Sequence, residues 1–462
     1  MSGRQGFDGT WSAEPASLLQ RRFGASRLAA LWATLVLSGP TVLLGFSLSS
    51  EGLSLSLQQM IIAVPMGAVI GGSILSLAAW AGAYNGVPTV LALRPAFGGS
   101  GAGVLGVVLT VTLVGWAAFQ LQAATESVAV AFGQAGLPAP GDVVIISVIG
   151  LVSGGLVMIG PARVAPQWIS RVVFGVAVVA VGIAIWLLST QPDPASLLVS
   201  EQTNALWLGI DSVLALGILW FPLVGDVSRF ATDESVAATG TALGFGSTAV
   251  IASLIGGTAA LLGEGPANIA AGVTSSLPGY AGLIVIVVWM LGVQALLPFA
   301  VGYAAGMVAV SITGRRLGKV VALVTVVVIV ALANLLRPDS VAALDSLLVV
   351  VGAVAAVYLV DFYVVRRRIY RTDQLYGRGS TYGTLNPWGW LAVAVGVAGS
   401  LLVHPVGPEA MVEWIEGLSI RAPLADLALP GLATAMALAG LVYWILGAML
   451  VREETVVSRV RL

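Results

Sequence analysis

The residues best suited to bind a ligand lie in the segment GWAAFQLQ, which runs from Gly115 to Gln122. Trp116 and Gln120 are four residues apart, so on a helix their side chains lie on the same face, one turn apart. A carboxamide in an apolar segment is costly unless a partner satisfies its hydrogen bonds. A flat heterocycle could stack on the indole ring and form two hydrogen bonds with the amide. The alternative is that Trp116 only packs and that Gln120 bonds a neighbouring helix.

The composition indicates that this segment lies in a membrane. Of the 462 residues, 58% are apolar and 9% are charged, whereas a soluble domain carries about 25% charged residues. A helix needs roughly 20 apolar residues to cross the hydrocarbon core of a bilayer, so the chain has room for about a dozen helices joined by short loops. We therefore expect an all-α polytopic membrane protein. The chain has no cysteine, which excludes disulfides, thiol catalysis and cysteine-ligated metals.

Apolar runs bounded by charged residues, glycine and proline predict twelve membrane-spanning helices. Residues 1–27 are polar and precede the first run without a visible cleavage site, so they are expected to form an ordinary cytoplasmic tail. Residues 366–389 form a basic loop, and residues 452–462 form a second tail. The predicted helices are residues 28–48, 57–80, 103–130, 143–160, 172–190, 205–224, 241–262, 281–310, 320–336, 346–365, 390–403 and 430–451.

The basic residues predict the orientation of the chain. With the N-terminus in the cytoplasm, every lysine and arginine except Arg337 and Arg421 falls on the cytoplasmic side of the predicted helices. Cytoplasmic loops of membrane proteins carry such an excess of positive charge. We therefore expect a multi-pass protein of the cell membrane with both termini in the cytoplasm.

Two of the predicted helices contain residues that interrupt helices. Ser38, Gly39 and Pro40 lie in the middle of the first helix, and Gly217 and Pro222 lie in the sixth. Proline removes a backbone donor and clashes with the preceding turn. Backbone groups freed in this way can face a ligand. A simple kink is the alternative for each helix taken alone.

The first and sixth helices are the first members of two sets of five. A set with an odd number of helices enters the membrane from the opposite side on its second occurrence, which is the inverted-repeat plan of many secondary transporters. We therefore expect a ten-helix transport core at residues 28–365, with repeats at about 28–190 and about 205–365, followed by two accessory helices within residues 390–451. The binding site is expected between the discontinuous helices.

Polar side chains within the sixth and eighth helices are further candidates. Asp211 lies near the start of the sixth helix, and an acidic residue inside a membrane helix is a candidate proton carrier, unless the helix begins later in the chain. Asp226 and Arg229, at the other end of this helix, either pair locally or contribute to an inner gate. Gln294 is the strong polar side chain in the eighth helix. His404, the single histidine, lies in an outer loop and receives no role.

Several segments, taken in order, carry a family resemblance. They are GAYNGVPTVLALRPAFG after helix 2, GW in helix 3, LWFPLVGDVSRF at the end of helix 6, DFYVVRRR after helix 10, and DQLY and NPWGW before helix 11. Together they resemble the nucleobase:cation symporter family, which includes purine, cytosine, hydantoin and thiamine-precursor permeases. The resemblance covers nearly the whole chain, and the helix 6 segment is most similar to the cytosine and hydroxymethylpyrimidine permeases.

The resemblance implies the five-plus-five inverted-repeat fold shared with sodium-coupled amino-acid transporters, with the substrate between helices 1, 3, 6 and 8. The family's stacking aromatic residue in helix 3 falls on Trp116, and the glutamine of some members falls on Gln120. The helix 8 amide falls on Gln294. The helix 1 break at Ser38 and Gly39 is included in the expected substrate site.

The helix 6 stacking position of the family falls near Leu216 and Gly217, where this chain has no aromatic residue. The resemblance therefore implies that one face of the substrate contacts aliphatic groups, or that Trp220 supplies a ring from the next turn.

The coupling ion is a second point of departure from the family. Where sodium-coupled members place hydroxyl residues on helix 8, this chain aligns Leu296 and Leu297, followed by Pro298. Sodium is a hard cation that needs oxygen ligands, and leucine supplies none. Between H⁺ and Na⁺, we therefore favour H⁺, with Asp211 as the candidate ion-coupling residue.

These observations predict a secondary active transporter that imports a nucleobase or related heterocycle of the cytosine, purine or hydroxymethylpyrimidine type. An amino-acid or amine permease of the same fold is the alternative, and a channel or solute receptor could use the same site. A membrane enzyme would need clustered acids, histidines or a nucleophile with its base, which we do not find. We expect no cofactor, no metal, no nucleic acid and no obligate protein partner beyond the lipid bilayer.

Overall fold

The computed structural model describes residues 11–37, 39–49, 53–160, 205–261, 279–336, 340–376, 382–421, 424 and 429–460. Within these ranges, the regular secondary structure is helical, apart from an isolated parallel bridge between Phe23 and Ala231. Six of the described helices are long and apolar enough to cross a membrane, or up to eight if each of two bent pairs is one span. This confirms the expected all-α membrane architecture. The expected fifth helix, residues 172–190, lies outside the described residues.

The helices of the first half begin close to their predicted positions and connect in sequence through short loops. Two one-turn helices, α4 and α5, follow the second membrane helix, where the sequence predicts a connection rich in turn-forming residues. The elements are α1 (Ala25–Val36), α2 (Gly39–Ser49), α3 (Leu57–Asn85), α4 (Thr89–Ala92), α5 (Arg94–Phe97), α6 (Gly99–Gln134) and α7 (Asp142–Ile159).

The second half contains two π-helical turns, η3 and η4, and a short 3₁₀ helix, η5, that the sequence pattern does not predict. The elements are α10 (Ala205–Leu219), α11 (Phe221–Ser228), α12 (Glu234–Leu261), α14 (Ala281–Trp289), η3 (Met290–Gln294), α15 (Leu296–Thr313), α16 (Gly318–Ala333), α17 (Ser340–Val360), η4 (Asp361–Val365), η5 (Thr372–Leu375), α18 (Pro387–Val403), α19 (Glu409–Glu416) and α21 (Gly431–Val460). The last helix, α21, continues beyond its predicted end at residue 451.

Both predicted helix breaks are present. The axes of α1 and α2 differ by 55°, and those of α10 and α11 differ by 43°. Pro222 lies in the first turn of α11, where its missing N–H costs nothing. In a continuous helix with α10, however, the ring of Pro222 would clash with the preceding turn and a backbone hydrogen bond would be lost. Gly39 begins α2, whereas Ser38 lies outside the described residues. The predicted discontinuous helices 1 and 6 are therefore confirmed.

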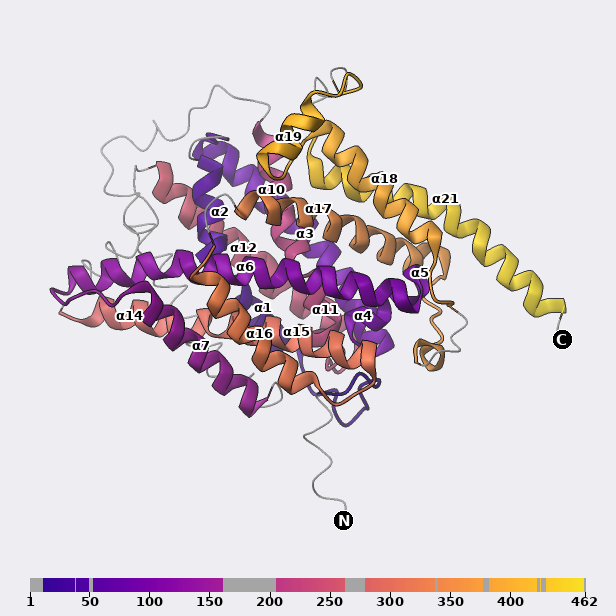
Figure 1. The fold of residues 1–462 in the computed structure, drawn as a ribbon, viewed down its shortest axis with the longest axis horizontal. Coiled ribbons are helices and arrows are strands. Elements are labelled where there is room, and N and C mark those ends of the chain that lie inside the picture. Colours follow the sequence, from indigo (N-terminus) through magenta and orange to yellow (C-terminus); the bar gives the residue numbers. More distant parts are fainter. Residues whose placement is uncertain are drawn as a thin grey trace, which may run out of the picture.

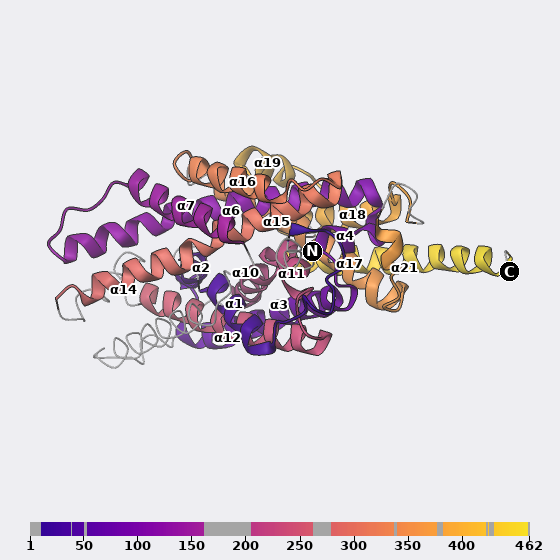
Figure 2. The same ribbon diagram turned by 90° about the horizontal axis from the view of Figure 1, so that it is seen from below.

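The helices form two groups with the broken helix α10–α11 between them, as Figure 2 shows. In one group, α12 packs on α1, α2 and α3. In the other group, α15 and α16 pack on each other and on α6 and α7. The accessory helices α18 and α21 lie side by side at one edge of the molecule (Figure 1), and α21 also packs on α17.

Glycine allows α10 and α3 to approach closely. A Cβ atom on Gly217 would lie 2.8 Å from the Cα atom of Gly71, which is closer than real Cβ atoms approach backbone. Small residues at such contacts let membrane helices pack through their backbones. Gly217 therefore serves the packing of α10 against α3.

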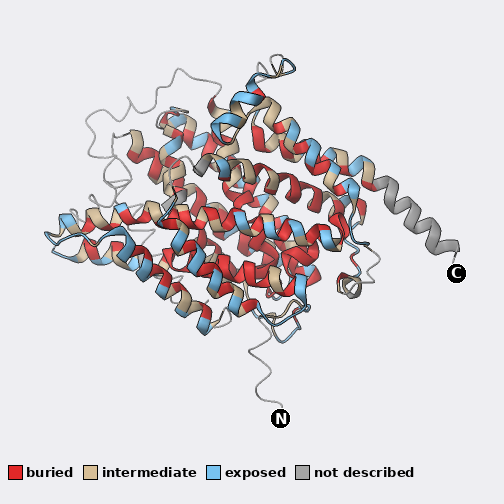
Figure 3. Cartoon of the chain, in the orientation of Figure 1, coloured by how far each residue is buried: buried red, intermediate tan, exposed pale blue. Residues whose placement is uncertain are grey.

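The outer surface of the helices is apolar. Buried residues concentrate in the central helices and exposed ones on the periphery (Figure 3), and large exposed hydrophobic side chains include Leu151 at 78%, Val327 at 67%, Val69 at 66% and Leu243 at 60%. Such a surface is unfavourable in water and favourable in lipid. Together with the long apolar spans, it identifies a multi-pass membrane protein.

Candidate functional site

Two glutamines from distant parts of the chain meet in the interior. Gln120 lies on α6 and Gln294 is the last residue of η3, and their side chains are 3% and 0% exposed. The Nε2 atom of Gln120 donates a hydrogen bond of 3.1 Å to the Oε1 atom of Gln294. The Nε2 atom of Gln294 has no partner in the described part of the chain. Because a buried amide donor without a partner is costly, this atom is a candidate ligand contact.

Trp116 lies one turn before Gln120 on α6, as the spacing predicts. Its ring is partly buried and packs edge to face with Phe119, with 5.8 Å between the ring centroids. The indole N–H of Trp116 has no hydrogen-bond partner within the described ranges. One stretch of α6 therefore carries an indole ring with a free donor and, one turn later, the glutamine that bonds Gln294 of η3.

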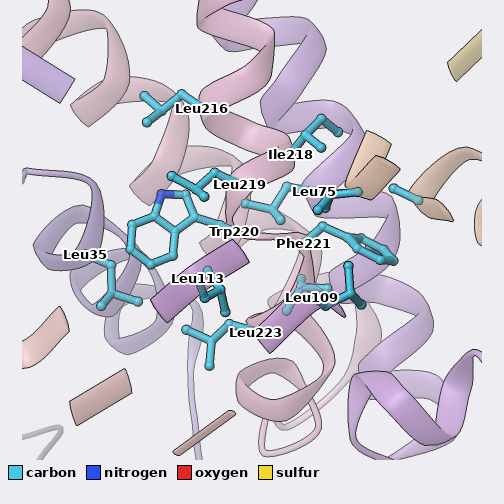
Figure 4. Close-up of a cluster of buried hydrophobic side chains, with 14 of the residues drawn as sticks. Leu35, Leu75, Leu109, Leu113, Leu216, Ile218, Leu219, Trp220, Phe221 and Leu223 are labelled. Atoms are coloured by element: carbon cyan, nitrogen blue, oxygen red, sulfur yellow. The ribbon is translucent and has the colours of Figure 1, made fainter. Parts of the chain in front are cut away.

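Trp220 lies at the break between α10 and α11, directly before the first residue of α11, and its side chain makes no capping hydrogen bond. Its side chain is 2% exposed and packs edge to face with Trp32 of α1, with 6.5 Å between the ring centroids. In Figure 4 the ring lies within a buried apolar cluster that includes Leu35 and Leu113. Its indole N–H also lacks a partner in the described chain. The break of helix 6 thus places a second indole among α1, α6 and α10.

The two other helix 6 candidates serve packing. Leu216 is 7% exposed and belongs to the apolar cluster of Figure 4. Gly217 faces the backbone of α3 at Gly71. Trp220 is therefore the aromatic residue at the helix 6 break, and its contact with the substrate stays a prediction.

The break of helix 1 is held by side chains from three helices. The indole N–H of Trp289, on α14, donates to the carbonyl oxygen of Leu37 at 3.2 Å. The hydroxyl of Thr41 donates to the carbonyl oxygen of Val36 at 2.5 Å, and the hydroxyl of Ser253 on α12 donates to the carbonyl oxygen of Thr41 at 3.4 Å. The first two bonds satisfy backbone acceptors at the end of α1 that the bend removes from the helix, and the third ties the start of α2 to α12.

The start of α15 carries two apolar side chains. Leu296 and Leu297 are 4% and 3% exposed, and neither offers an oxygen atom. The hydroxyl of Ser153 on α7 lies 2.8 Å from the carbonyl oxygen of Ala295 and 2.8 Å from that of Ile149, and its single proton is shared between these two acceptors. Within the described ranges, no group of three or more histidine, cysteine or acidic residues could hold a metal ion.

Asp211 binds the N-terminus of α21. Its Oδ2 atom accepts the backbone N–H of Leu432 at 2.8 Å, and its Oδ1 atom accepts that of Ala433 at 2.9 Å. A carboxylate at this position satisfies the free amides and interacts favourably with the helix dipole. Burial lowers the pKa of His404, at the end of α18, although the negative charge of Asp211 nearby acts in the opposite direction. Asp211 therefore has a structural role, and its role as a proton carrier stays a prediction.

Arg229 and Asp226 lie buried at the end of α11, with side-chain exposures of 1% and 2%. Arg229 donates to the backbone oxygen of Ser12 at 2.8 Å and to the hydroxyl of Tyr303 at 2.8 Å. Asp226 accepts the backbone N–H of Thr89 and interacts with the charge of Arg229. Arg229 therefore connects α11 to the N-terminal segment and to α15, and a direct pair with Asp226 stays a prediction.

The sequence reading missed a buried carboxylate at the end of helix 10. Asp361, with 0% exposure, accepts hydrogen bonds from the hydroxyls of Tyr370 at 2.6 Å and Tyr443 at 2.8 Å, and Arg366 pairs with it at 3.3 Å. Tyr443 lies on α21, so this cluster joins the accessory helix to the core. The DFYVVRRR segment contains the signal, because its first residue is an acid inside an apolar run.

The sequence was compared with protein families and with proteins of curated function. Residues 19–423 match the family described as permeases for cytosine/purines, uracil, thiamine and allantoin. Among proteins of curated function, none matches the chain in sequence.

Solved structures share the fold. Mhp1, a nucleobase-cation-symport-1 family transporter in a closed conformation with bromovinylhydantoin bound, is 18% identical, matches over 96% of both chains and has a TM-score of 0.68. Its inward-facing conformation is 16% identical, over 96% of this chain and 93% of that chain, with the same TM-score of 0.68. A Na⁺-coupled sialic acid symporter in an outward-open state is 13% identical, over 97% of this chain and 93% of that chain, with a TM-score of 0.60.

Proposed function

Because the chain belongs to the family of permeases for cytosine/purines, uracil, thiamine and allantoin, we propose that it imports a nucleobase or a related flat heterocycle. As a secondary active transporter of this family, it moves its substrate together with a cation by alternating access. The substrate lies where α6, η3 and the two helix breaks meet.

The observation that carries this proposal is the amide pair. The single hydrogen bond between Gln120 and Gln294 leaves the carbonyl oxygen of Gln120 and the amide nitrogen of Gln294 for a ligand. An acceptor beside a donor is complementary to the adjacent N–H and C=O groups on the edge of a pyrimidine or purine. The pair carries no charge, which favours a neutral heterocycle over an amino acid with its ammonium and carboxylate groups.

The two indoles provide surfaces for a flat ring. Trp116 and Trp220 come from different helices, and both have free N–H donors within the described chain. In our proposal one ring face of the substrate stacks on Trp116, and Trp220 contacts the other side of the substrate. Stacking on an aromatic face contributes to the binding free energy in addition to the contribution of the buried area.

We favour protons over sodium as the coupling ion. The side chains at the start of α15, Leu296 and Leu297, offer no oxygen ligand, and the carbonyl oxygens of Val36 and Leu37 already accept hydrogen bonds. Sodium binding requires several oxygen atoms at once, as other hard cations do. The local chemistry therefore supports a proton-coupled mechanism.

We place the face that carries the N-terminal segment in the cytoplasm of the cell. Arg94, Arg229 and Arg366 all make hydrogen bonds at this face, and the excess of basic residues in the loops on this side of the predicted helices supports the assignment. Substrate then enters from the opposite face and leaves past the N-terminal segment.

Ligand binding to the purified protein tests the substrate class. We expect a purine, a pyrimidine or a hydantoin to raise the melting temperature, because a ligand that binds the folded state stabilises it. The same ligand is expected to lose this effect in Trp116→Ala. If amino acids shift the melting temperature and heterocycles do not, the proposed substrate class is wrong.

A transport assay tests the carrier mechanism. Reconstituted vesicles preloaded with unlabelled substrate are expected to take up labelled substrate transiently against its gradient. Such counterflow requires a site that alternates between the two sides. Uptake that does not saturate and shows no counterflow would indicate a channel.

A further inference from the structure

The N-terminal segment Trp11–Phe23, which we call the strap, lies against the core at the face where α11, α15 and α16 meet. The sequence predicts an ordinary tail here. The residues of the strap instead make hydrogen bonds and ring contacts with segments from both halves of the chain. The strap therefore connects segments that are far apart in the sequence.

The first attachment is to the end of the broken helix 6. Arg229, 1% exposed, donates to the backbone oxygen of Ser12 at 2.8 Å and also to the hydroxyl of Tyr303 on α15 at 2.8 Å. One buried guanidinium therefore holds α11, α15 and the strap together. Hydrogen bonds from a charged donor are stronger than those from a neutral one.

The second attachment is the ring of Trp11. It packs edge to face with Tyr303, with 5.3 Å between the ring centroids. It also lies over two glycines, because a Cβ atom on Gly306 or Gly318 would lie 3.0 Å or 3.1 Å from the ring. The absence of side chains at these positions of α15 and α16 leaves room for the indole.

Three further attachments fix the rest of the strap. The hydroxyl of Tyr376 donates to the backbone oxygen of Ala13 at 2.8 Å, and the N–H of Ala16 donates to the oxygen of Gly86, after α3, at 2.8 Å. Phe23 forms the parallel bridge with the segment after α11, and its N–H donates to the oxygen of Phe230 at 2.9 Å. The strap thus joins the end of α3 in the first half to α11, α15 and α16 in the second.

We propose that the strap is a latch that holds the transporter closed at this face and that must leave its seat before substrate is released there. The proposal rests on the proposed alternating-access function, in which the helix ends on one face separate to open a path. Elements that are joined through one segment cannot separate while that segment stays bound to all of them. Trp11 and Arg229 are the latch's main anchors.

Cysteine labelling tests the latch directly, because the chain contains no cysteine of its own. The reporter is Leu223→Cys on α11, which is 1% exposed and lies in the apolar cluster around Trp220. It is labelled with a membrane-impermeant maleimide added to the N-terminal face, in the absence of substrate. We expect Trp11→Ala to raise the labelling rate about 2- to 10-fold, since it removes an aromatic contact that stabilises the closed state.

Three controls define the outcome. Trp11→Phe keeps a ring against Tyr303 and is expected to restore slow labelling. Trp414→Ala, on α19 at 67% exposure, is expected to have no effect. A second reporter is Leu48→Cys, which is buried at 0% exposure near the end of α2. Its labelling rate is expected to stay low with and without each Trp11 substitution.

The latch is disproved if labelling of Leu223→Cys is unchanged both in Trp11→Ala and after deletion of residues 1–15. It is also disproved if Leu48→Cys accelerates equally, because this would indicate general loosening. The assay contains no substrate, so it gives its answer even if the proposed substrate class is wrong. A heterocycle-induced thermal shift that persists in Trp11→Ala would separately show that the substrate site is intact.

Discussion

At the scale of single residues, the hydrogen bond between Gln120 and Gln294 is the most informative contact of the molecule. It joins α6 to η3 across 174 positions of the sequence. The bond fixes how both amides are oriented, because it assigns the nitrogen of Gln120 as donor and the oxygen of Gln294 as acceptor. A site that is oriented before the ligand arrives loses less conformational entropy on binding.

Replacing Gln294 by leucine is therefore expected to weaken heterocycle binding about tenfold or more. The variant removes a ligand donor and also leaves the amide nitrogen of Gln120 buried without its acceptor. Binding isotherms of the purified protein measure the effect. The matched control is Gln122→Leu, because Gln122 is on the same helix but donates to the backbone oxygen of Leu336 at 3.1 Å. Equal losses in both variants would contradict the assigned site.

Replacing Asp211 by asparagine separates two roles of this residue. The capping role predicts a loss of about 1 kcal/mol in the free energy of unfolding, because the charge at the N-terminus of α21 disappears. The proton-carrier hypothesis predicts, in addition, that pH-dependent accumulation is lost while substrate binding is retained. Thermal unfolding and uptake at two pH values measure the two effects independently. Accumulation that keeps its pH dependence would leave Asp211 with the capping role alone.

At the scale of elements, the close packing of α10 on α3 makes Gly217 sensitive to substitution. Gly217→Ala is expected to destabilise the protein by about 1–3 kcal/mol, because the added methyl group overlaps the backbone of Gly71. The control is Gly246→Ala on α12, where a Cβ atom would have no neighbour within 4 Å. Thermal unfolding in detergent compares the two. If Gly217→Ala left the melting temperature unchanged, α10 and α3 would be able to move apart without a cost in stability.

The helix breaks and the Trp116–Gln120 pair were predictable because their signals are local. Pro222 ends one helix through its own ring, and a spacing of four residues places two side chains on one face of α6 whatever the rest of the chain does. The partner of Asp211 was not predictable, since Leu432 lies 221 positions away in the sequence.

The strap was missed for a similar reason. Residues 11–23 have the pattern of a polar tail because they bind through few side chains of their own. Their partners are the ring of Tyr303, the side chains of Arg229 and Tyr376, two glycines of α15 and α16, and backbone atoms. Backbone acceptors and glycines carry no periodic signal. Sequence patterns therefore predicted the helices well and predicted poorly what joins their ends.

At the scale of the whole molecule, the two helix groups of Figure 2 meet at the broken helix α10–α11, because both of its parts pack on α3 and α11 also contacts α6 and α15. Alternating access requires these groups to move relative to each other around the substrate. A coupling ion shifts the equilibrium between the two states only if it binds one of them more tightly than the other.

Sodium is expected to leave this equilibrium unchanged. The thermal shift produced by a heterocycle should be the same in sodium and in potassium buffers, because Leu296 and Leu297 replace the oxygen ligands that a sodium site at the start of α15 would need. Accumulation in vesicles should instead follow an imposed pH gradient. The matched variant Leu297→Ser adds one hydroxyl at this position. If its thermal shift became sodium-dependent, the start of α15 would be the place where this chain lacks a sodium ligand. A sodium-dependent shift in the wild-type protein, in contrast, would require that backbone carbonyls near Val36 and Ala295 bind the ion without help from α15 side chains, and the proton-coupled mechanism would then be wrong.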